Sequence, residues 1–120
     1  MNKKDILVVD DEEAVTKLIA IYLNAEGYEV RTAANGEEAL RKIRQDKPAL
    51  VLLDIMLPDI DGIDTLKKIK ALDKNIPVVI VTGIYANEEA KIALEAGASD
   101  YITKPIDFQY LKDSILLQML

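Results

Sequence analysis

The chain contains no cysteine and no histidine among its 120 residues. The absence of cysteine excludes disulfides, thiolate metal sites and cysteine nucleophiles. The absence of histidine excludes a histidine general base, a Ser-His catalytic triad, a histidine-ligated zinc and a phosphohistidine carrier within this chain. Any chemistry must therefore come from carboxylates, hydroxyls, lysines, bound metals and backbone groups.

The chain also lacks an excess of positive charge and any long apolar segment. Its 15 Lys and Arg residues face 21 Asp and Glu residues, for a net charge of −6. A domain with this balance is not expected to bind nucleic acid by itself, because it cannot neutralise many phosphates. No stretch is long enough to span a membrane, and the apolar run at 6–9 is too short for a signal-peptide core. We therefore expect a cytoplasmic protein without membrane contact.

The composition indicates one globular domain over residues 1–120. Half of the residues are apolar and 30% are charged, which is typical of folded and not of disordered chains. A chain of this length is the size of one ordinary domain and can bury a sizeable core without disulfides.

Short apolar runs alternate with amphipathic stretches along the whole chain. The runs predict strands over 6–9, 28–32, 49–53, 78–81 and 98–103. Helical spacing of apolar residues predicts helices over 12–25, after Asn35, over 63–72, over 87–96 and from 107 to the last residue. In the first helix, the expected inward stripe consists of Val15, Leu18, Ile19 and Tyr22.

This alternation predicts an α/β fold. Near-continuous apolar strands indicate a parallel sheet that is covered on both faces, and right-handed crossovers then give a doubly wound, flavodoxin-like (βα)5 arrangement. We expect the strand order 2-1-3-4-5, because 28–32 is the most polar strand and suits an edge.

Several polar residues are expected at the ends of the helices. Asn35, Asp61, Asn87 and Asp107 are in place to cap the helices that follow them. Asn35 is followed three residues later by Glu38, which is the spacing of a capping box. The helices over 12–25 and 87–96 are expected to stop at Gly27 and Gly97.

Polar side chains also follow the central strands of the predicted sheet. The residues at these strand ends are Asp10, Asp11, Asp54, Thr82 and Lys104. In doubly wound sheets ligands bind outside the carboxyl ends of the strands, so these side chains are expected to converge on one site.

The chemistry of this set points to a metal and a phosphoryl group. Two carboxylates about 4 Å apart repel by about 4 kcal/mol at an effective dielectric constant of 20, so the acids need a counterion. Mg²⁺ prefers oxygen ligands and commonly uses one or two carboxylates together with a phosphate. Lys104 can bind one phosphoryl oxygen and Thr82 can donate to another. A remaining carboxylate is then a candidate nucleophile, and the sequence favours Asp54 on the central strand.

Five ordered motifs then identify a resemblance over the whole chain. They are VVDDE at 8–12, LLDIMLPD at 52–59 with Gly62, VTG at 81–83, GASDY at 97–101 and KP at 104–105. The sequence closely resembles the receiver domain of bacterial two-component response regulators, and five matches at domain-wide spacing make the resemblance specific.

The resemblance implies a role for each residue of the site. Asp54 would be the phosphoacceptor and would share Mg²⁺ with Asp11, with Asp10 mostly through water, and with the backbone carbonyl of Met56. Lys104 would pair with the phosphoryl group, and its bond to Pro105 would be cis.

The resemblance also implies a switch. Thr82 would move toward the phosphoryl group, Tyr101 would swing inward with it, and Gly83 would leave the group room to enter. The surface formed by 87–96, 98–103 and the last helix would rearrange and contact a downstream effector domain or protein. The Ala-rich helix over 87–96 suits a movable element.

The implied reaction is a two-component phosphorelay step. Asp54 would take the phosphoryl group from a phosphohistidine of a sensor histidine kinase, and the acyl phosphate would later hydrolyse in the same site. The chain would thus be a phosphorylatable signalling switch and not a metabolic enzyme. Met56 and Ile84 would flank the hydrolytic water and are apolar, so we expect slow self-dephosphorylation.

Two other classes of function are weighed against this one. A degenerate receiver that acts as a constitutive docking module conflicts with the intact polar set. A flavodoxin-like cofactor binder lacks a phosphate-cradling loop after the first strand, where Asp10 and Asp11 would repel a phosphate.

Three further features are the segment 59–63, Glu12 and the apolar residues over 116–120. The segment 59–63 resembles a haloacid-dehalogenase nucleophile motif, but it lies in a loop and not at a strand end. Glu12 is expected to be a first-turn helix acid and not a metal ligand. The apolar residues over 116–120 leave two interpretations open: a helix end tucked against the body, or an exposed patch for a homodimer or an output domain.

Overall fold

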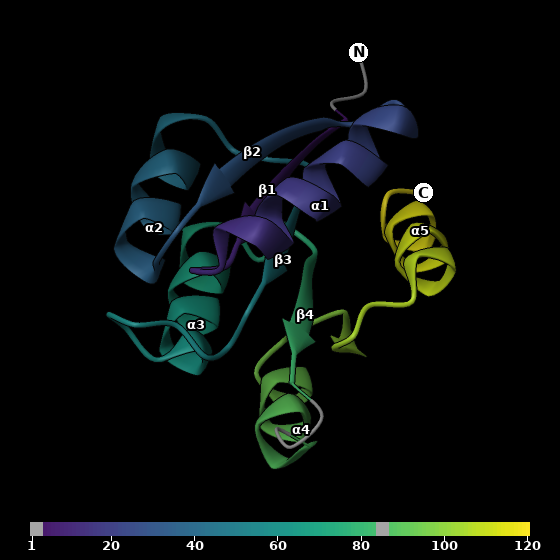
Figure 1. Cartoon of the computed structure of the whole chain (residues 1–120). Helices are drawn as coiled ribbons and strands as arrows, with labels where there is room; N and C mark the ends of the chain where they lie inside the picture. The colour runs from purple at the N-terminus through teal and green to yellow at the C-terminus, as the bar shows by residue number, and fades with distance from the viewer. Residues whose placement is uncertain (1–3, 84–86) are drawn as a thin grey trace.

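The computed structural model describes residues 4–83 and 87–120, without the side chain of Asn87. The expectations for Ile84 and for capping by Asn87 lie outside this part of the chain. In it, strands and helices alternate from one end to the other (Figure 1). The strands are β1 (Asp5–Val9), β2 (Glu29–Ala33), β3 (Leu50–Leu53), β4 (Val78–Thr82) and β5 (Asp100–Thr103). The helices are α1 (Glu13–Ala25), α2 (Gly36–Gln45), α3 (Gly62–Leu72), α4 (Asn87–Glu95) and α5 (Phe108–Gln118).

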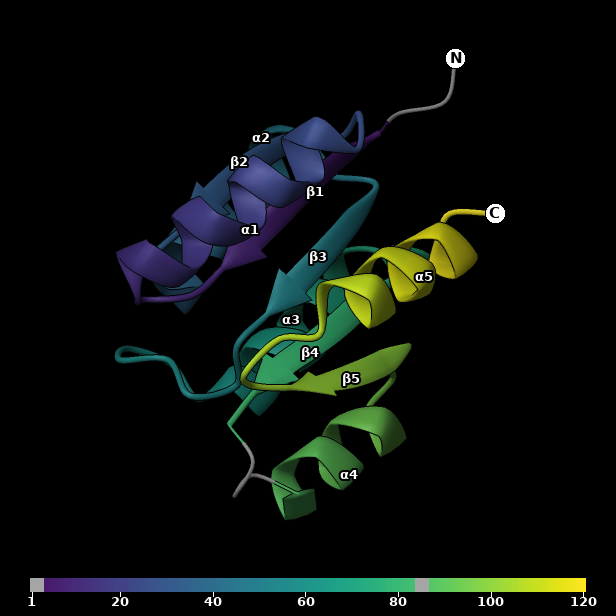
Figure 2. The same ribbon diagram turned by 45° about the vertical axis from the view of Figure 1, so that its right-hand side comes forward.

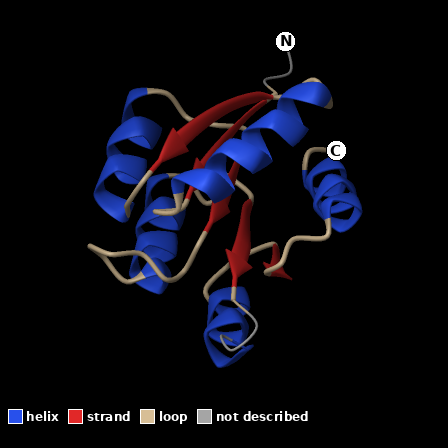
Figure 3. Cartoon of the chain, in the orientation of Figure 1, coloured by secondary structure: helices blue, strands red, loops and turns tan. Residues whose placement is uncertain are grey.

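The strands form one parallel sheet in the order β2-β1-β3-β4-β5, which confirms the predicted fold and strand order. Figure 3 shows the strands as a twisted layer between helices. The polar strand β2 lies at one edge, as its composition indicates.

The sheet separates two apolar cores. On one face, α1 and α5 pack through Ile19, Leu23, Leu111 and Ile115, and α2, α3 and α4 cover the opposite face (Figure 2). Alternate residues of each strand enter opposite cores because successive side chains point to opposite faces of a sheet. Two buried faces favour apolar residues at successive positions, which explains the apolar runs of β1, β3 and β4, with the polar residues Asp5 and Thr82 at strand ends.

The predicted caps position the helices. The Asn35 side chain accepts from Glu38 N, and the side chains of Asp61 and Asp107 accept backbone N–H groups of α3 and α5. The Glu38 carboxylate accepts from Ala34 N at 3.2 Å and not from Asn35 N, so the capping box is incomplete. Gly27 and Gly97 have φ values of 95° and 111°, which only glycine adopts without strain.

Several boundaries and one buried position differ from the predictions. β1 begins at Asp5, β2 begins and ends one residue later than expected, and β5 begins only at Asp100. Leu18 is 56% exposed, so its place in the inward stripe of α1 was predicted wrongly. The buried face of α1 is centred on Ile19 and Leu23, and consecutive helical residues lie 100° apart around the axis.

The last turns of α5 leave apolar side chains in solvent. Leu116, Leu117 and Leu120 are 54%, 66% and 94% exposed, whereas Leu111 and Ile115 are buried. Of residues 116–120, Met119 packs partly against the core and these leucines are exposed, while a role of this patch in a homodimer or an output domain stays a prediction. Across the described residues, the helices are all too short or too polar for a membrane span.

Candidate functional site

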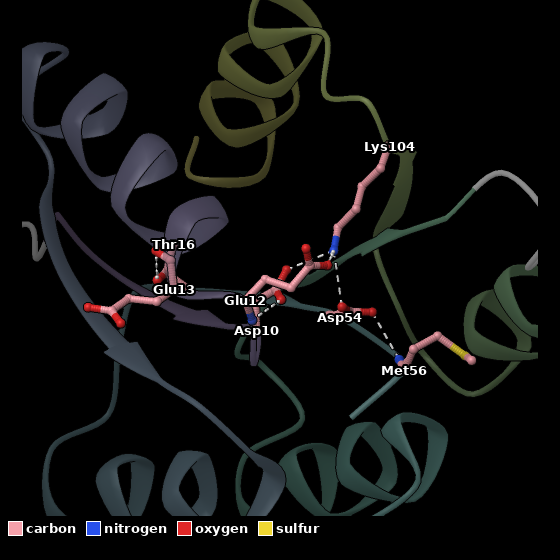
Figure 4. A network of polar contacts seen from close by, with 7 residues as sticks. All are labelled: Asp10, Glu12, Glu13, Thr16, Asp54, Met56 and Lys104. Carbon is pink, nitrogen blue, oxygen red and sulfur yellow. Dashed lines mark hydrogen bonds and ion pairs between the residues drawn. The ribbon is translucent and has the colours of Figure 1, made fainter. Parts of the chain in front are cut away.

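The backbone of the sheet brings the predicted site residues together. The N–H groups of three residues extend the strand ladders by one step each: Asp10 N donates to Ala33 O, Asp54 N to Val9 O and Lys104 N to Thr82 O. These hydrogen bonds place Asp10, Asp54 and Lys104 at the same rim of the sheet, from which their side chains converge (Figure 4). The predicted convergence is thus observed for these three strand ends.

Asp10 has a buried carboxylate with two partners. The residue is 4% exposed, its Oδ1 accepts from Glu12 N at 2.9 Å, and its Oδ2 lies 2.9 Å from Lys104 Nζ. The first contact joins the start of α1 to the site, because Glu12 is the residue directly before that helix.

Asp54 has the same pattern on the next strand of the sheet. It is 4% exposed, its Oδ1 accepts from Met56 N at 2.9 Å, and its Oδ2 lies 3.1 Å from Lys104 Nζ. Burial raises the pKa of Asp54 above its usual value, although the Met56 N–H and the Lys104 charge oppose this shift. The carboxylate is therefore fixed, partly desolvated and directed toward the positive charge.

Lys104 is the cation at the centre of the cluster. Its Nζ lies 2.9 Å from Asp10 Oδ2, 3.1 Å from Asp54 Oδ2 and 3.4 Å from a Glu12 oxygen. Burial disfavours the ammonium, but the hydrogen bond to Asp10 and the charges of Asp54 and Asp10 outweigh it and raise the pKa of Lys104. The bond between Lys104 and Pro105 is cis, as expected.

The carboxylates of the cluster outnumber this one lysine. Oxygens of Asp10, Asp11 and Asp54 all lie within 4.8 Å of one another, and Asp11 is exposed. This donor set is made of oxygens alone and carries excess negative charge, which is the environment that Mg²⁺ prefers. The three residues could therefore hold a magnesium ion, and they are the ones that the sequence predicts.

Thr82 adjoins the cluster through its backbone, because Thr82 O accepts from Lys104 N, whereas Tyr101 lies within the strand β5. Thr82 is 1% exposed, and its Oγ1 has no hydrogen-bond partner among the described residues. An unpaired buried hydroxyl costs free energy, so Thr82 would gain from an acceptor that arrives in the site. Tyr101 is 39% exposed on the edge strand β5.

The loop between β3 and α3 carries Met56 and is held at both ends. Gly62 N donates to Ile55 O, and a Cβ atom on Gly62 would lie only 2.1 Å from the Ile55 Cα atom, so glycine is required there. The Asp59 carboxylate accepts from Gly36 N at 2.9 Å and from Glu37 N at 3.0 Å. Asp59 thus caps α2 from another part of the chain, and the segment 59–63 supplies caps and not a nucleophile.

Sequence reasoning missed two of these contacts. It expected Glu12 to be a first-turn acid of α1, whereas its carboxylate reaches Lys104. It assigned no role to Asp59, and only the loop geometry shows that Asp59 supports the N-terminus of α2. The position of Glu12 directly after two predicted metal ligands is the only signal that could have indicated the first contact.

Comparisons with known proteins identify relatives for this arrangement. The family model for the response regulator receiver domain matches residues 6–116. The chain is 46% identical to the alkaline phosphatase synthesis transcriptional regulatory protein PhoP of Bacillus subtilis, over 88% of this chain and 43% of that protein. It is 43% identical to the transcriptional regulatory protein ZraR of Salmonella typhimurium, over 94% of this chain and 26% of that protein. The chain thus spans less than half the length of these curated relatives.

Solved structures show the same architecture. The receiver domain of NtrX from Brucella abortus superposes with a TM-score of 0.92 at 39% identity, covering 96% of this chain and 98% of that one. The response regulator protein TrrA from Thermotoga maritima, in complex with Mg²⁺ and BeF, gives a TM-score of 0.87 at 36% identity, covering 96% and 98%.

Proposed function

The chain belongs to the response regulator receiver domain family, and we propose on that premise that Asp54 accepts a phosphoryl group from a phosphohistidine of a sensor histidine kinase. Receiver domains of this family act as phosphorylation switches. The observation that supports Asp54 as the acceptor is its carboxylate, which is buried and fixed by Met56 N yet directed at Lys104.

In the proposed step, an Asp54 carboxylate oxygen forms a bond to phosphorus. The P–N bond of the phosphohistidine breaks, and its electron pair returns to the imidazole nitrogen of the kinase. Lys104 Nζ would hold an oxygen of the phosphoryl group, because it already lies 3.1 Å from Asp54 Oδ2. The Thr82 hydroxyl would donate to another oxygen and so gain a partner, which it lacks within the described part of the chain. The residues contribute mainly by positioning and by neutralising charge.

Magnesium is the proposed cofactor of this step. Asp10, Asp11, Asp54 and the backbone carbonyl of Met56 would hold Mg²⁺, and the three clustered carboxylates fit a hard cation. When bound, Mg²⁺ supplies positive charge that reduces the repulsion between the carboxylates and an anionic phosphoryl group. Among the described residues, the Lys104 ammonium is the cation that contacts these carboxylates.

The proposed output is a change of the surface formed by α4, β5 and α5. Thr82 is the last residue of β4, so its movement toward a phosphoryl group would act on the segment that leads to α4. Within the described part of α4, the buried side chains are Ala90 and Ala93, which anchor the helix with little apolar area. Tyr101 on β5 would turn inward, and a downstream effector domain or protein would bind the changed surface. The relatives PhoP and ZraR are named as transcriptional regulatory proteins.

The chain would catalyse its own phosphorylation and dephosphorylation and no other reaction. Met56 is 65% exposed at the site, and its thioether cannot orient an attacking water well. Slow loss of the phosphoryl group therefore stays a prediction. The cytoplasmic location of the protein also stays a prediction. Polar residues in place of Met56 and Ile84 should accelerate the loss after loading with a small phosphodonor, and an unchanged decay would contradict this.

Binding of beryllofluoride, which mimics a phosphoryl group on a carboxylate, tests the proposed function. Mg²⁺ alone should raise the melting temperature of the chain, and Mg²⁺ with beryllofluoride should raise it further. Asp54→Asn should abolish the second increase. Asp64→Asn is the matched control, because Asp64 is an exposed acid on α3 and its replacement makes the same change in charge. A melting temperature that does not change with Mg²⁺ would contradict the proposal. The docking module and the cofactor binder both predict no binding of beryllofluoride.

A homodimer through the exposed patch of α5 is a separate proposal. Leu116, Leu117 and Leu120 are the apolar side chains that such a contact would cover. Sedimentation with and without beryllofluoride tests it, and a monomer in both states would remove it.

A further inference from the structure

The side chain of Glu12 contacts the candidate phosphorylation site instead of capping the helix that follows it. Glu12 is the N-cap residue of α1, but within the described residues its side chain makes no capping hydrogen bond. Its carboxylate oxygen lies 3.4 Å from Lys104 Nζ, and its backbone N–H donates to Asp10 Oδ1 (Figure 4). The backbone of Glu12 therefore holds Asp10 in place, while its side chain forms an ion pair with the Lys104 ammonium.

Lys104 has no donor to spare in this arrangement. A lysine ammonium has three N–H donors, and three carboxylates surround this one at 2.9, 3.1 and 3.4 Å. A phosphoryl oxygen can bind Lys104 only if one of these carboxylates gives way. The Asp10 and Asp54 side chains are 3% and 6% exposed and fixed by backbone N–H groups.

The Glu12 side chain differs from the other two in each respect. It is 63% exposed and makes the longest of the three contacts with Lys104. An exposed ion pair at this distance is weak and is exchanged easily for water. Glu12 is therefore the carboxylate that an arriving phosphoryl group displaces first, and its negative charge stays near the site after displacement.

We propose that Glu12 is a positioning residue that opposes phosphorylation: its carboxylate occupies Lys104 in the unmodified chain and repels the phosphoryl group that replaces it. This inference rests on the proposed function of Asp54. Glu12 shifts the equilibrium of the switch toward the unmodified state. Its negative charge stabilises the Lys104 ammonium before phosphorylation and disfavours the anionic product afterwards.

The affinity for beryllofluoride in saturating Mg²⁺ measures this effect directly. Glu12→Gln keeps the size of the side chain and removes its charge, and it should bind beryllofluoride about threefold more tightly at low salt, as expected for one charge about 6 Å away in water. High salt should narrow this difference, because exposed charges are screened. Calorimetric titration gives both dissociation constants.

The neighbouring residue provides a matched control. Glu13→Gln makes the same change in net charge one position along, but the Glu13 carboxylate is 80% exposed and pairs with Lys17 at 3.0 Å. Its affinity for beryllofluoride should equal that of the unsubstituted chain. Glu12→Asp keeps the charge and should therefore bind beryllofluoride more weakly than Glu12→Gln.

The outcomes separate this inference from the proposed function. If the unsubstituted chain binds beryllofluoride and Asp54→Asn does not, the proposed function holds and the variants at Glu12 can be judged. Equal affinity for Glu12→Gln and Glu13→Gln, weaker binding by Glu12→Gln than by the unsubstituted chain, or equal affinity for the Asp and Gln variants would each overturn the role of Glu12. No binding by the unsubstituted chain would overturn the proposed function and the inference together.

Discussion

The two ends of β1 each bury a carboxylate, but the charges around them are balanced differently. Asp5 and Asp10 are both 4% exposed. Asp5 pairs with Arg31 at 2.9 Å and accepts from Ala49 N at 3.1 Å. Asp10, at the opposite end, shares Lys104 with Asp54 and with Glu12.

This difference separates a structural ion pair from the ion pairs of the proposed phosphorylation site. At the Asp5 end the Arg31 guanidinium also donates to Asp46 O, so the pair joins three segments of the chain. At the Asp10 end the acids exceed the cations, which leaves net negative charge at a rim that can gain a positive ion. This excess of negative charge lowers the stability of the fold, which is common at functional sites.

Loss of the shared lysine should give the largest effect. Lys104→Met would leave the buried Asp10 and Asp54 carboxylates without their common cation, and we expect the free energy of unfolding without metal to fall by about 3 kcal/mol. Saturating Mg²⁺ should restore more stability in this variant than it adds to the unsubstituted chain, because the site is then more negative. Urea unfolding with EDTA and with Mg²⁺ measures both quantities. Equal gains from Mg²⁺ would contradict the proposed metal site.

The corresponding change at the other end should be smaller and indifferent to metal. Arg31→Met removes the ion pair with Asp5, and we expect a loss of about 2 kcal/mol, since Arg31 is 29% exposed and Asp5 keeps the hydrogen bond from Ala49 N. The same urea experiment provides the comparison. A rescue of this variant by Mg²⁺ beyond that of the unsubstituted chain would show that the two ends are not independent.

Asp59 is a carboxylate whose negative charge is stabilised by backbone N–H groups of α2 and not by a cation. Desolvation opposes its ionisation, but the backbone hydrogen bonds, led by those from Glu37 N and Gly36 N, together outweigh it and lower the pKa of Asp59. We expect Asp59→Asn to cost about 1 kcal/mol near neutral pH, because a charged cap at a helix N-terminus is replaced by a neutral one.

The pH dependence of this loss follows from the direction of the shift. A lowered pKa in the folded chain means that the contribution of Asp59 is complete above the unfolded value of about 3.9 and disappears as the pH falls through the folded value. The stability difference between Asp59→Asn and the unsubstituted chain should therefore shrink in acid. A difference that is constant from neutral pH to pH values below the folded pKa would contradict the charged cap.

Removal of an excess acid should give the smallest effect, with the opposite sign. Asp11 is exposed and lies in the group of clustered carboxylates. Asp11→Asn should raise the metal-free stability by about 0.5 kcal/mol, because it relieves repulsion that solvent partly screens. It should also reduce the stabilisation by Mg²⁺. A loss of metal-free stability would show that the acids at this end are balanced after all.

Much of this molecule could be predicted from local patterns. The alternation of strands and helices, the caps at Asn35, Asp61 and Asp107, and the convergence of polar strand ends all depend on residues close in sequence or on general rules of parallel sheets. Periodicity could not centre the buried face of α1, so Leu18 was placed inside when it lies outside. It also could not show that Asp59 caps a helix 23 residues earlier in the chain.

Local patterns alone identify the residues at the ends of the strands, because continuous apolar runs define a doubly covered parallel sheet whose carboxyl ends share one rim. Local patterns do not show which basic residue pairs with each acid. Asp5 and Asp10 flank the same apolar run, yet one meets an arginine 26 residues away and the other a lysine 94 residues away. Only the order and register of the strands decide such pairings, since they bring together charges that no local pattern connects.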